Sequence, residues 1–178
     1  MKKFIRFSMM ALALGFGFAA CDVETDEEPG GTNVQDMAGH WEVTVDIVDQ
    51  SGNLLYSDPY GMGVIEVLTY NTSANDTDSI WITDSKNFWA FTMKIPCDVN
   101  TRTFSCPEKD YDADGTGKAI ITNGKILPGA AKNLHGMPND SIVFDITFSD
   151  DDADGDRVPD PYCYIYRISG QKYTGFYE

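Results

Sequence analysis

The sequence is poor in basic residues and in histidine, and each shortage excludes a class of function. Its 178 residues hold 13 Lys and Arg against 28 Asp and Glu, a formal net charge of −15, and only 2 His. Nucleic acids and anionic membrane surfaces are recognised by basic faces, so we expect neither as a partner. With 42% hydrophobic and 12% aromatic residues the chain can build a core, and its length suits one domain or two.

Motifs for catalysis are also missing. The chain has no Gly-x-Ser-x-Gly elbow and no His-Glu-x-x-His. His135, Asp140 and Ser141 could be drawn as a triad, but residues so close along a chain rarely reach triad geometry. A carboxylate pair for glycoside hydrolysis stays open as an alternative, because nothing singles out two of the 28 acids. We therefore assign no catalytic residue.

Residues 1–20 have the pattern of an export signal. Three basic residues among the first six precede an uncharged stretch, residues 7–20, which is too short to span a bilayer. The stretch ends in Phe18-Ala19-Ala20-Cys21, which resembles the lipobox of bacterial lipoproteins. The resemblance implies that Cys21 is lipidated and begins the mature chain. Cleavage by an ordinary signal peptidase and a buried N-terminal helix are the alternatives.

Residues 21–36 are expected to form an acidic, disordered tether. Five acids in residues 22–28 are followed by Pro29-Gly30-Gly31, with no apolar periodicity. The acidic run resembles the surface-export signal of Bacteroidetes lipoproteins, whereas Asp22 directly after Cys21 resembles an enterobacterial inner-membrane retention signal. Because the run continues well past Asp22, we expect a lipoprotein of the outer membrane, exposed on the cell surface and held there by its lipid.

From residue 37 onward, apolar residues recur with a period of two, which is typical of half-buried strands. Turn signals, among them Asn123-Gly124 and Ser169-Gly170, separate the segments. No long window has a helical stripe. The predicted strands are 41–47, 63–70, 80–83, 89–95, 102–106, 118–122, 142–148, 162–169 and 172–177. Strands of this number and spacing predict an all-β antiparallel barrel or sandwich.

Gly39-His40-Trp41 favours the barrel. It resembles the Gly-x-Trp of the lipocalin-like (calycin) superfamily, in which the Trp closes one end of the barrel beneath a basic side chain. Arg167 or Lys172 could supply that side chain here. We therefore expect a calycin-like barrel of about eight strands over residues 37–178.

The order of short blocks along the chain is similar to that of a Bacteroidetes family described as lipid-binding putative hydrolases. The resemblance implies a calycin-like barrel on a lipoprotein anchor, with room for a ligand. The word hydrolase in that description corresponds to no motif in this sequence. The blocks are Ala38–Trp41, Leu68–Thr72, Ile80–Ile82, Phe91–Cys97, Thr103–Ser105, Ile121–Lys125, Asp140–Ile142 and Ser169–Phe176.

Cysteines and acids suggest two stabilising features. An exported chain meets an oxidising compartment, and Cys97 and Cys106 flank a short predicted hairpin, so we predict a disulfide between them and an odd thiol at Cys163.

A hard cation prefers closely spaced carboxylates around a Gly, and residues 150–160 resemble the calcium loops of thrombospondin type 3 repeats. The predicted calcium ligands are Asp150, Asp152, Asp154, Asp156 and Asp160. A solvated acidic loop is the alternative.

The aromatic residues are the best basis for a function. Small barrels either fill their interior or hold one small ligand, and both outcomes stay open here. We expect a non-enzymatic binding protein for a small apolar or amphipathic, lipid-like ligand. A hydrolase acting on lipid or glycan, a surface that stacks on sugars and a structural accessory of an outer-membrane complex are the alternatives. The residues expected to line the cavity are Trp41, Trp89, Phe91, Phe144 and Tyr164.

Overall fold

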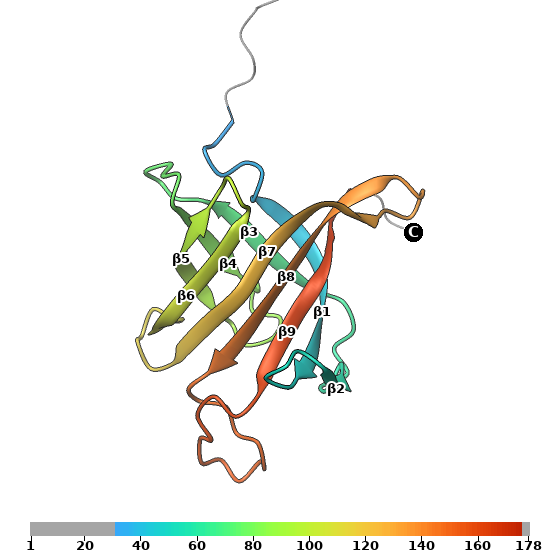
Figure 1. Cartoon of the computed structure of the whole chain (residues 1–178). Coiled ribbons are helices and arrows are strands. Elements are labelled where there is room, and N and C mark those ends of the chain that lie inside the picture. Colours follow the sequence, from blue (N-terminus) through green and yellow to red (C-terminus); the bar gives the residue numbers. More distant parts are fainter. Residues whose placement is uncertain (1–30, 176–178) are drawn as a thin grey trace, which may run out of the picture. The chain divides into compact units, whose positions relative to one another are not determined.

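Alternating apolar and polar side chains arrange the chain as strands around one core (Figure 1). The computed structural model describes residues 31–175, so the predicted signal peptide and Cys21 lie outside the described residues. The strands are β1 (Gly39–Val48), β2 (Leu54–Ser57), β3 (Ile65–Asn71), β4 (Ser79–Thr83), β5 (Thr92–Asp98), β6 (Thr103–Asp110), β7 (Lys118–Lys132), β8 (Pro138–Phe148) and β9 (Ile165–Lys172).

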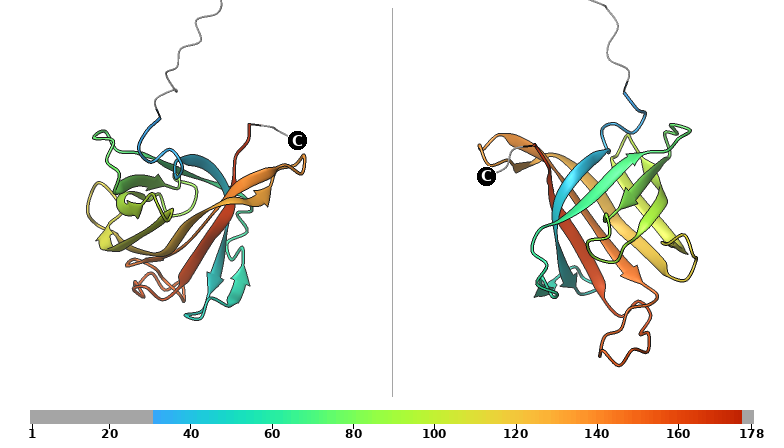
Figure 2. Two further views of the ribbon diagram at one scale, coloured as in Figure 1. Left: turned by 45° about the horizontal axis from the view of Figure 1, so that its top comes forward. Right: turned by 180° about the vertical axis from the view of Figure 1, so that it is seen from behind.

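The sheet closes on itself. Its strand order is β2-β1-β3-β4-β5-β6-β7-β8-β9, and β1 also pairs with β9 over Trp41–Val48 (Figures 1 and 2). All pairs of neighbouring strands are antiparallel, and β2 is an extra strand that pairs with the last residues of β1. The predicted all-β, calycin-like barrel of about eight strands is therefore confirmed. Among residues 31–175 there is no helix that is long and apolar enough to cross a membrane.

Inward-facing side chains form one continuous buried core. In β1 the buried positions are Trp41, Val43, Val45 and Ile47, which alternate with half-buried polar residues, as the period of two requires. Every other strand except β2 contributes to the same core, and several of its largest side chains are aromatic. The interior is thus filled by side chains of the protein itself.

A buried tryptophan and a short turn close the end of the barrel where β1 begins, which we call the plug end. The indole N–H of Trp41 donates to the Thr69 hydroxyl at 2.8 Å, and that hydroxyl donates to the Met37 carbonyl at 2.6 Å. The Lys172 ammonium lies over the Trp41 ring, 5.7 Å from its centroid, which is a cation–π contact. Of the two predicted basic partners, Lys172 is therefore the one in contact. The packed unit begins at Thr32, so residues 32–36, which the sequence assigned to the tether, belong with the barrel.

Arg167, the other candidate, braces the outside of the barrel. Its guanidinium donates to both carboxylate oxygens of Asp145, at 2.8 and 3.1 Å, and to the Gly52 carbonyl at 3.0 Å. Asp145 is buried, and this bidentate pairing supplies the hydrogen bonds that a buried carboxylate needs. The bond to Gly52 ties the β1–β2 hairpin to β9.

Two predicted turns are wrong. Ser169-Gly170 lies inside β9, where a Cβ on Gly170 would be 1.9 Å from the Glu42 carbonyl oxygen. Glycine is needed there for the close approach of β1 and β9, and no separate strand follows β9 in the described residues. Asn123-Gly124 lies at an irregularity in the β7–β8 register, and β7 continues to Lys132. Glycine in a strand often marks such a bulge or a close contact, and here Gly124 packs directly on Phe104.

Candidate functional site at the capped end of the barrel

The loop between β4 and β5, residues 84–91, covers the end of the barrel opposite the plug end. We call it the cap loop and this end the cap end. Asp84 is fully buried, and its carboxylate accepts hydrogen bonds from the amides of Lys86 (3.0 Å), Phe88 (2.9 Å), Trp89 (2.7 Å) and Ala90 (2.9 Å). A buried carboxylate is tolerated only when it is hydrogen bonded in this way. Asp84 is thus the residue that organises the cap loop.

Aromatic side chains of the cap loop pack on rings at the ends of β8 and β9. The Trp89 ring is stacked on Phe148, with centroids 4.4 Å apart and an interplanar angle of 6°. Phe88 meets Tyr166 edge-on at 5.1 Å, and Phe91 is fully buried 6.2 Å from Phe148. We call these five residues the cap cluster. Contacts of this geometry add to the apolar area that the rings bury.

Asp150 connects the cap loop to the loop that follows β6. Its carboxylate accepts the indole N–H of Trp89 at 3.3 Å and the hydroxyl of Tyr111 at 2.7 Å. Burial, followed by the bond to Asp150, raises the pKa of Tyr111 above its usual range, so the phenol remains a hydrogen-bond donor at neutral pH. Asp150 therefore lies at the rim of the barrel and holds two aromatic side chains from two different loops.

Asp151 binds the hydroxyl of Tyr166 and, through Tyr166, is connected to Tyr60. It is buried, and it accepts the hydroxyl of Tyr166 at 2.9 Å. The Tyr60 hydroxyl lies 2.8 Å from that of Tyr166, and because the Tyr166 proton goes to Asp151, Tyr60 is the donor in this bond. Burial, then the bonds with Tyr60 and Asp151, raise the pKa of Tyr166. The cap end thus combines a large apolar surface with a few fixed polar groups.

Depressions open to solvent lie on both sides of the cap loop. One, of about 610 Å³, lies between the cap loop and the segment before β3, and is lined by Met62, Val64, Ile65, Glu66, Ser85 and Asn87. The other, of about 430 Å³, lies between the cap loop and β6, where Trp81, Ala90, Met93, Lys94, Lys109 and Tyr111 line it. Both volumes fall in the range of small-ligand sites.

The residues predicted to line a ligand cavity are spread along the barrel. Trp89 and Phe91 belong to the cap cluster, and Tyr164 is half-buried beside it, 6.1 Å from Tyr166. Phe144 is buried against Phe104 inside the barrel, and Trp41 lies at the plug end. The structure therefore brings three of the five predicted residues together at the cap end.

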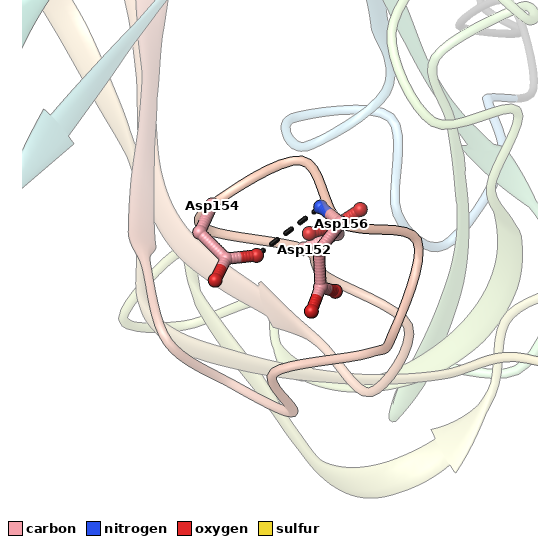
Figure 3. A group of neighbouring side chains, drawn as sticks. All are labelled: Asp152, Asp154 and Asp156. Atoms are coloured by element: carbon pink, nitrogen blue, oxygen red, sulfur yellow. Dashed lines mark hydrogen bonds between the residues drawn. The ribbon is translucent and has the colours of Figure 1, made fainter.

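The Asp-rich loop between β8 and β9 gathers some of the predicted calcium ligands. Asp152, Asp154 and Asp156 each place a carboxylate oxygen within 4.8 Å of the others (Figure 3). Oxygen atoms in a flexible loop are the donors that calcium prefers, so this group fits the ion. Asp150 is engaged with Trp89 and Tyr111, and an Asp160 oxygen accepts the Ala153 amide at 3.3 Å. The calcium site stays a prediction, with these three residues as its core.

The predicted disulfide is not formed. In the β5–β6 register Cys97 lies opposite Phe104, so Cys106 is its diagonal neighbour, and Cα atoms in such pairs are too far apart for a disulfide. Cys97, Cys106 and Cys163 are free thiols. Burial raises the pKa of Cys97 and Cys106, and burial together with Asp151 raises that of Cys163 to about 11.

The described contacts bring no catalytic group together. The Ser141 hydroxyl donates to the Gly170 carbonyl at 2.6 Å, and the Asp140 carboxylate accepts the Gly129 amide at 3.0 Å. His135 lies at the tip of the β7–β8 hairpin, between the two strands. Ser169 and Lys172 have the Ser-x-x-Lys spacing, but residues three apart in a strand face opposite sides. None of these groups belongs to the cap end.

Asp84 and Tyr60 contribute to the cap end but are not among the site residues predicted from the sequence. Asp84 opens the turn-forming stretch Asp84-Ser85-Lys86-Asn87 directly after β4, and this is the one signal that could have identified it. Tyr60 meets Tyr166 across 106 positions of sequence, for which the sequence carries no local signal. The roles of Asp150 and Asp151 were also missed, because both were read as part of the acidic loop that follows β8.

A closed antiparallel barrel of eight strands, with a tryptophan and a basic side chain at one end, defines the molecule as a calycin-like barrel protein. A family model described as lipid-binding putative hydrolase matches residues 26–177. The chain belongs to this family. A comparison with curated proteins finds no match to the chain.

Proposed function

We propose that the barrel binds a small apolar or amphipathic, lipid-like ligand at its cap end. The observation that carries the proposal is the cap cluster, in which the half-buried rings of Phe88 and Trp89 lie over three buried rings, with a solvent-open depression on each side of the cap loop. Membership of a family described as lipid-binding supports the same function. The filled core favours binding around the cap loop over binding along the barrel axis.

Polar groups at the same end suit an amphipathic ligand. The Tyr60 side chain is exposed with its hydroxyl bonded to that of Tyr166, and the carboxylate of Asp150 lies at the rim, so a ligand that moves the cap loop meets donors and acceptors beside apolar rings. Lipid-binding sites need this combination, because the headgroup must stay hydrated or hydrogen bonded while the chain is buried. Binding is then expected to alter the environment of Trp89 first.

The test is an NMR titration of the isotope-labelled protein with dodecanoate, monolauroylglycerol and lysophosphatidylcholine, each below its critical micelle concentration. We expect saturable shifts of the cap-loop amides and of the Trp89 indole N–H for at least one of them. Phe88→Ala removes apolar surface from the cap cluster and should weaken binding about tenfold. Leu134→Ala, at the exposed tip of the β7–β8 hairpin, is the matched control and should leave the affinity unchanged.

Two outcomes would overturn the proposal. The first is that none of the three amphiphiles gives a saturable response. The second is that Phe88→Ala and Leu134→Ala change the affinity equally, which would indicate adsorption on any exposed apolar residue.

We also propose that the protein is an outer-membrane lipoprotein anchored through Cys21 and exposed at the cell surface. The hydrophobic stretch that ends in Cys21 and the acidic run after it support this assignment. Expression of the wild type and of Cys21→Ser with a radiolabelled fatty acid tests the anchor. Label on the wild type alone supports it, whereas label on neither protein contradicts it. Digestion of intact cells by added protease tests surface exposure, since a protected protein would be inside the envelope.

A further inference from the structure

The hydrogen-bond ladder of the barrel is interrupted between β5 and β6. Only Cys97 with Phe104 and Asp98 with Thr103 are in register, and both pairs lie next to the hairpin turn. At the other end of the two strands, the Thr92 amide donates to the Tyr111 carbonyl at 2.9 Å. Between these points no residues of the two strands pair in register, whereas β4 and β5 stay in register from Ser79 with Pro96 to Thr83 with Thr92. We call this gap the seam.

A proline and a lysine lie at the seam. Pro107, in the middle of β6, has no N–H to donate, and the β6–β7 register also shifts there, so the pairing of β6 is irregular around this residue. The Lys109 ammonium crosses the gap and donates to the main-chain carbonyl of Lys94. A side chain has therefore replaced the backbone donor that a regular strand would supply.

The Lys109 ammonium brings positive charge to the seam in an acidic protein. Within residues 31–175 it has no carboxylate at ion-pair distance, whereas the ammonium of Lys94 pairs with Asp76 at 3.3 Å. Asp110 and Asp112 also border the seam, but the Asp112 carboxylate is held by the amide and hydroxyl of Thr116, at 3.1 and 2.7 Å. Lys109 is thus available to an anionic group that replaces the Lys94 carbonyl.

The depression of about 430 Å³ beside the cap loop lies along this seam. The half-buried ring of Trp81 supplies its apolar wall. Met93 also borders the depression, but its side chain is buried and faces the core, on the opposite side of the sheet from Trp81. Ala90, from the cap loop, borders the same depression. A depression with an apolar ring on its wall and two lysines at its edge, of which Lys94 is paired with Asp76, has the two elements that an anionic amphiphile requires.

We propose that the seam is the binding site for an anionic, single-chain amphiphile, such as a fatty-acid carboxylate. The headgroup binds the Lys109 ammonium, and the chain lies along the Trp81 ring toward Ala90 of the cap loop. This assignment rests on the proposed lipid-binding function and names the class of ligand and its place on the barrel. Charge selects this class, since the Lys109 ammonium attracts an anionic headgroup and repels a cationic one.

The test is isothermal titration of the full barrel with dodecanoate and with dodecyltrimethylammonium, which have chains of equal length and headgroups of opposite charge. We expect dodecanoate to bind at least tenfold more tightly. Lys109→Met keeps the length of the stem and removes the charge, so it should weaken dodecanoate binding about tenfold. Lys109→Arg should retain most of the affinity, and Lys132→Met, on the exposed β7–β8 hairpin, is the matched control. In NMR spectra the Trp81 indole N–H should shift with dodecanoate.

The outcomes separate this inference from the proposed function. If both amphiphiles bind equally well and Lys109→Met binds like the wild type, the seam assignment is wrong and lipid binding stands. If dodecanoate moves the Trp89 indole but not that of Trp81, the ligand lies under the cap loop and the seam is again overturned. If no amphiphile binds, the proposed function fails and the inference fails with it.

Discussion

Replacing Asp84 with alanine removes the one carboxylate that organises the cap loop. Its two oxygens accept four amide hydrogen bonds in a site that excludes water. If the loop kept its shape in Asp84→Ala, four amides would lose their partner, at about 1–3 kcal/mol each. If the loop opened, the amides would reach water, but the packing of two half-buried aromatic rings, about 2–3 kcal/mol together, would be lost. Opening is the less costly route, so we expect a loss of about 3 kcal/mol.

Urea unfolding gives the loss of stability, and amide hydrogen exchange shows where it arises. We expect Asp84→Ala to lower the unfolding midpoint and to expose the amides of residues 86–90 to fast exchange, while the barrel strands stay protected. Asp84→Asn keeps an oxygen for the three amides that share Oδ2, so only the bond from Lys86 is lost, at about 1 kcal/mol. Asp98→Ala, which removes an exposed acceptor from the β5–β6 turn, is the control.

If the free energy of unfolding of Asp84→Ala lay within about 0.5 kcal/mol of that of the wild type and the cap-loop amides stayed protected, the cap loop would not depend on the Asp84 carboxylate. That result would mean that ring packing alone sets the shape of the cap loop.

Three other predictions concern separate parts of the barrel. Gly170→Ala places a Cβ 1.9 Å from the neighbouring main-chain oxygen and should destabilise the closing strand pair by about 2 kcal/mol or more in urea, so an unchanged midpoint would contradict the assigned contact. The pKa of Cys163 is raised to about 11, so its thiolate is scarce at neutral pH, and alkylation by iodoacetamide should be slow at pH 7 and accelerate as the pH approaches 11. Fast alkylation at pH 7 would show that the pKa of this thiol is not raised. If the Asp-rich loop binds calcium, millimolar CaCl2 should raise the melting temperature of the wild type but not of an Asp154→Asn/Asp156→Asn variant, and equal melting curves would disprove the site.

The barrel was predictable because its pattern is local. A strand that is buried on one face repeats every two residues, and this signal survives in β1, β4 and β8 without knowledge of the neighbours. β2 was missed because all four of its residues are exposed, so it carries no alternation. Trp89 and Phe91 were read as part of a strand because their alternation runs on into β5, although Ala90 between them has a φ of 58°.

The cap end was less predictable because its contacts join distant residues. Tyr111 and Asp150 are 39 positions apart, and nothing near either residue indicates the bond. At the plug end the sequence did identify candidates, since a resemblance indicated that Arg167 or Lys172 lies over the Trp41 ring. Only the packing of the barrel shows that Lys172 is the residue in contact. The predicted disulfide failed for a related reason, since two cysteines beside one turn need the right register as well as proximity.

The interrupted ladder between β5 and β6 gives the barrel a mechanical property that its filled core conceals. A fully paired barrel resists widening, because any increase in girth must stretch hydrogen bonds all the way round. The β5–β6 pair is in register only at Cys97 with Phe104 and Asp98 with Thr103, so fewer main-chain hydrogen bonds oppose widening there than between β4 and β5. We therefore expect mechanical or thermal strain to separate β5 from β6 before it separates β4 from β5.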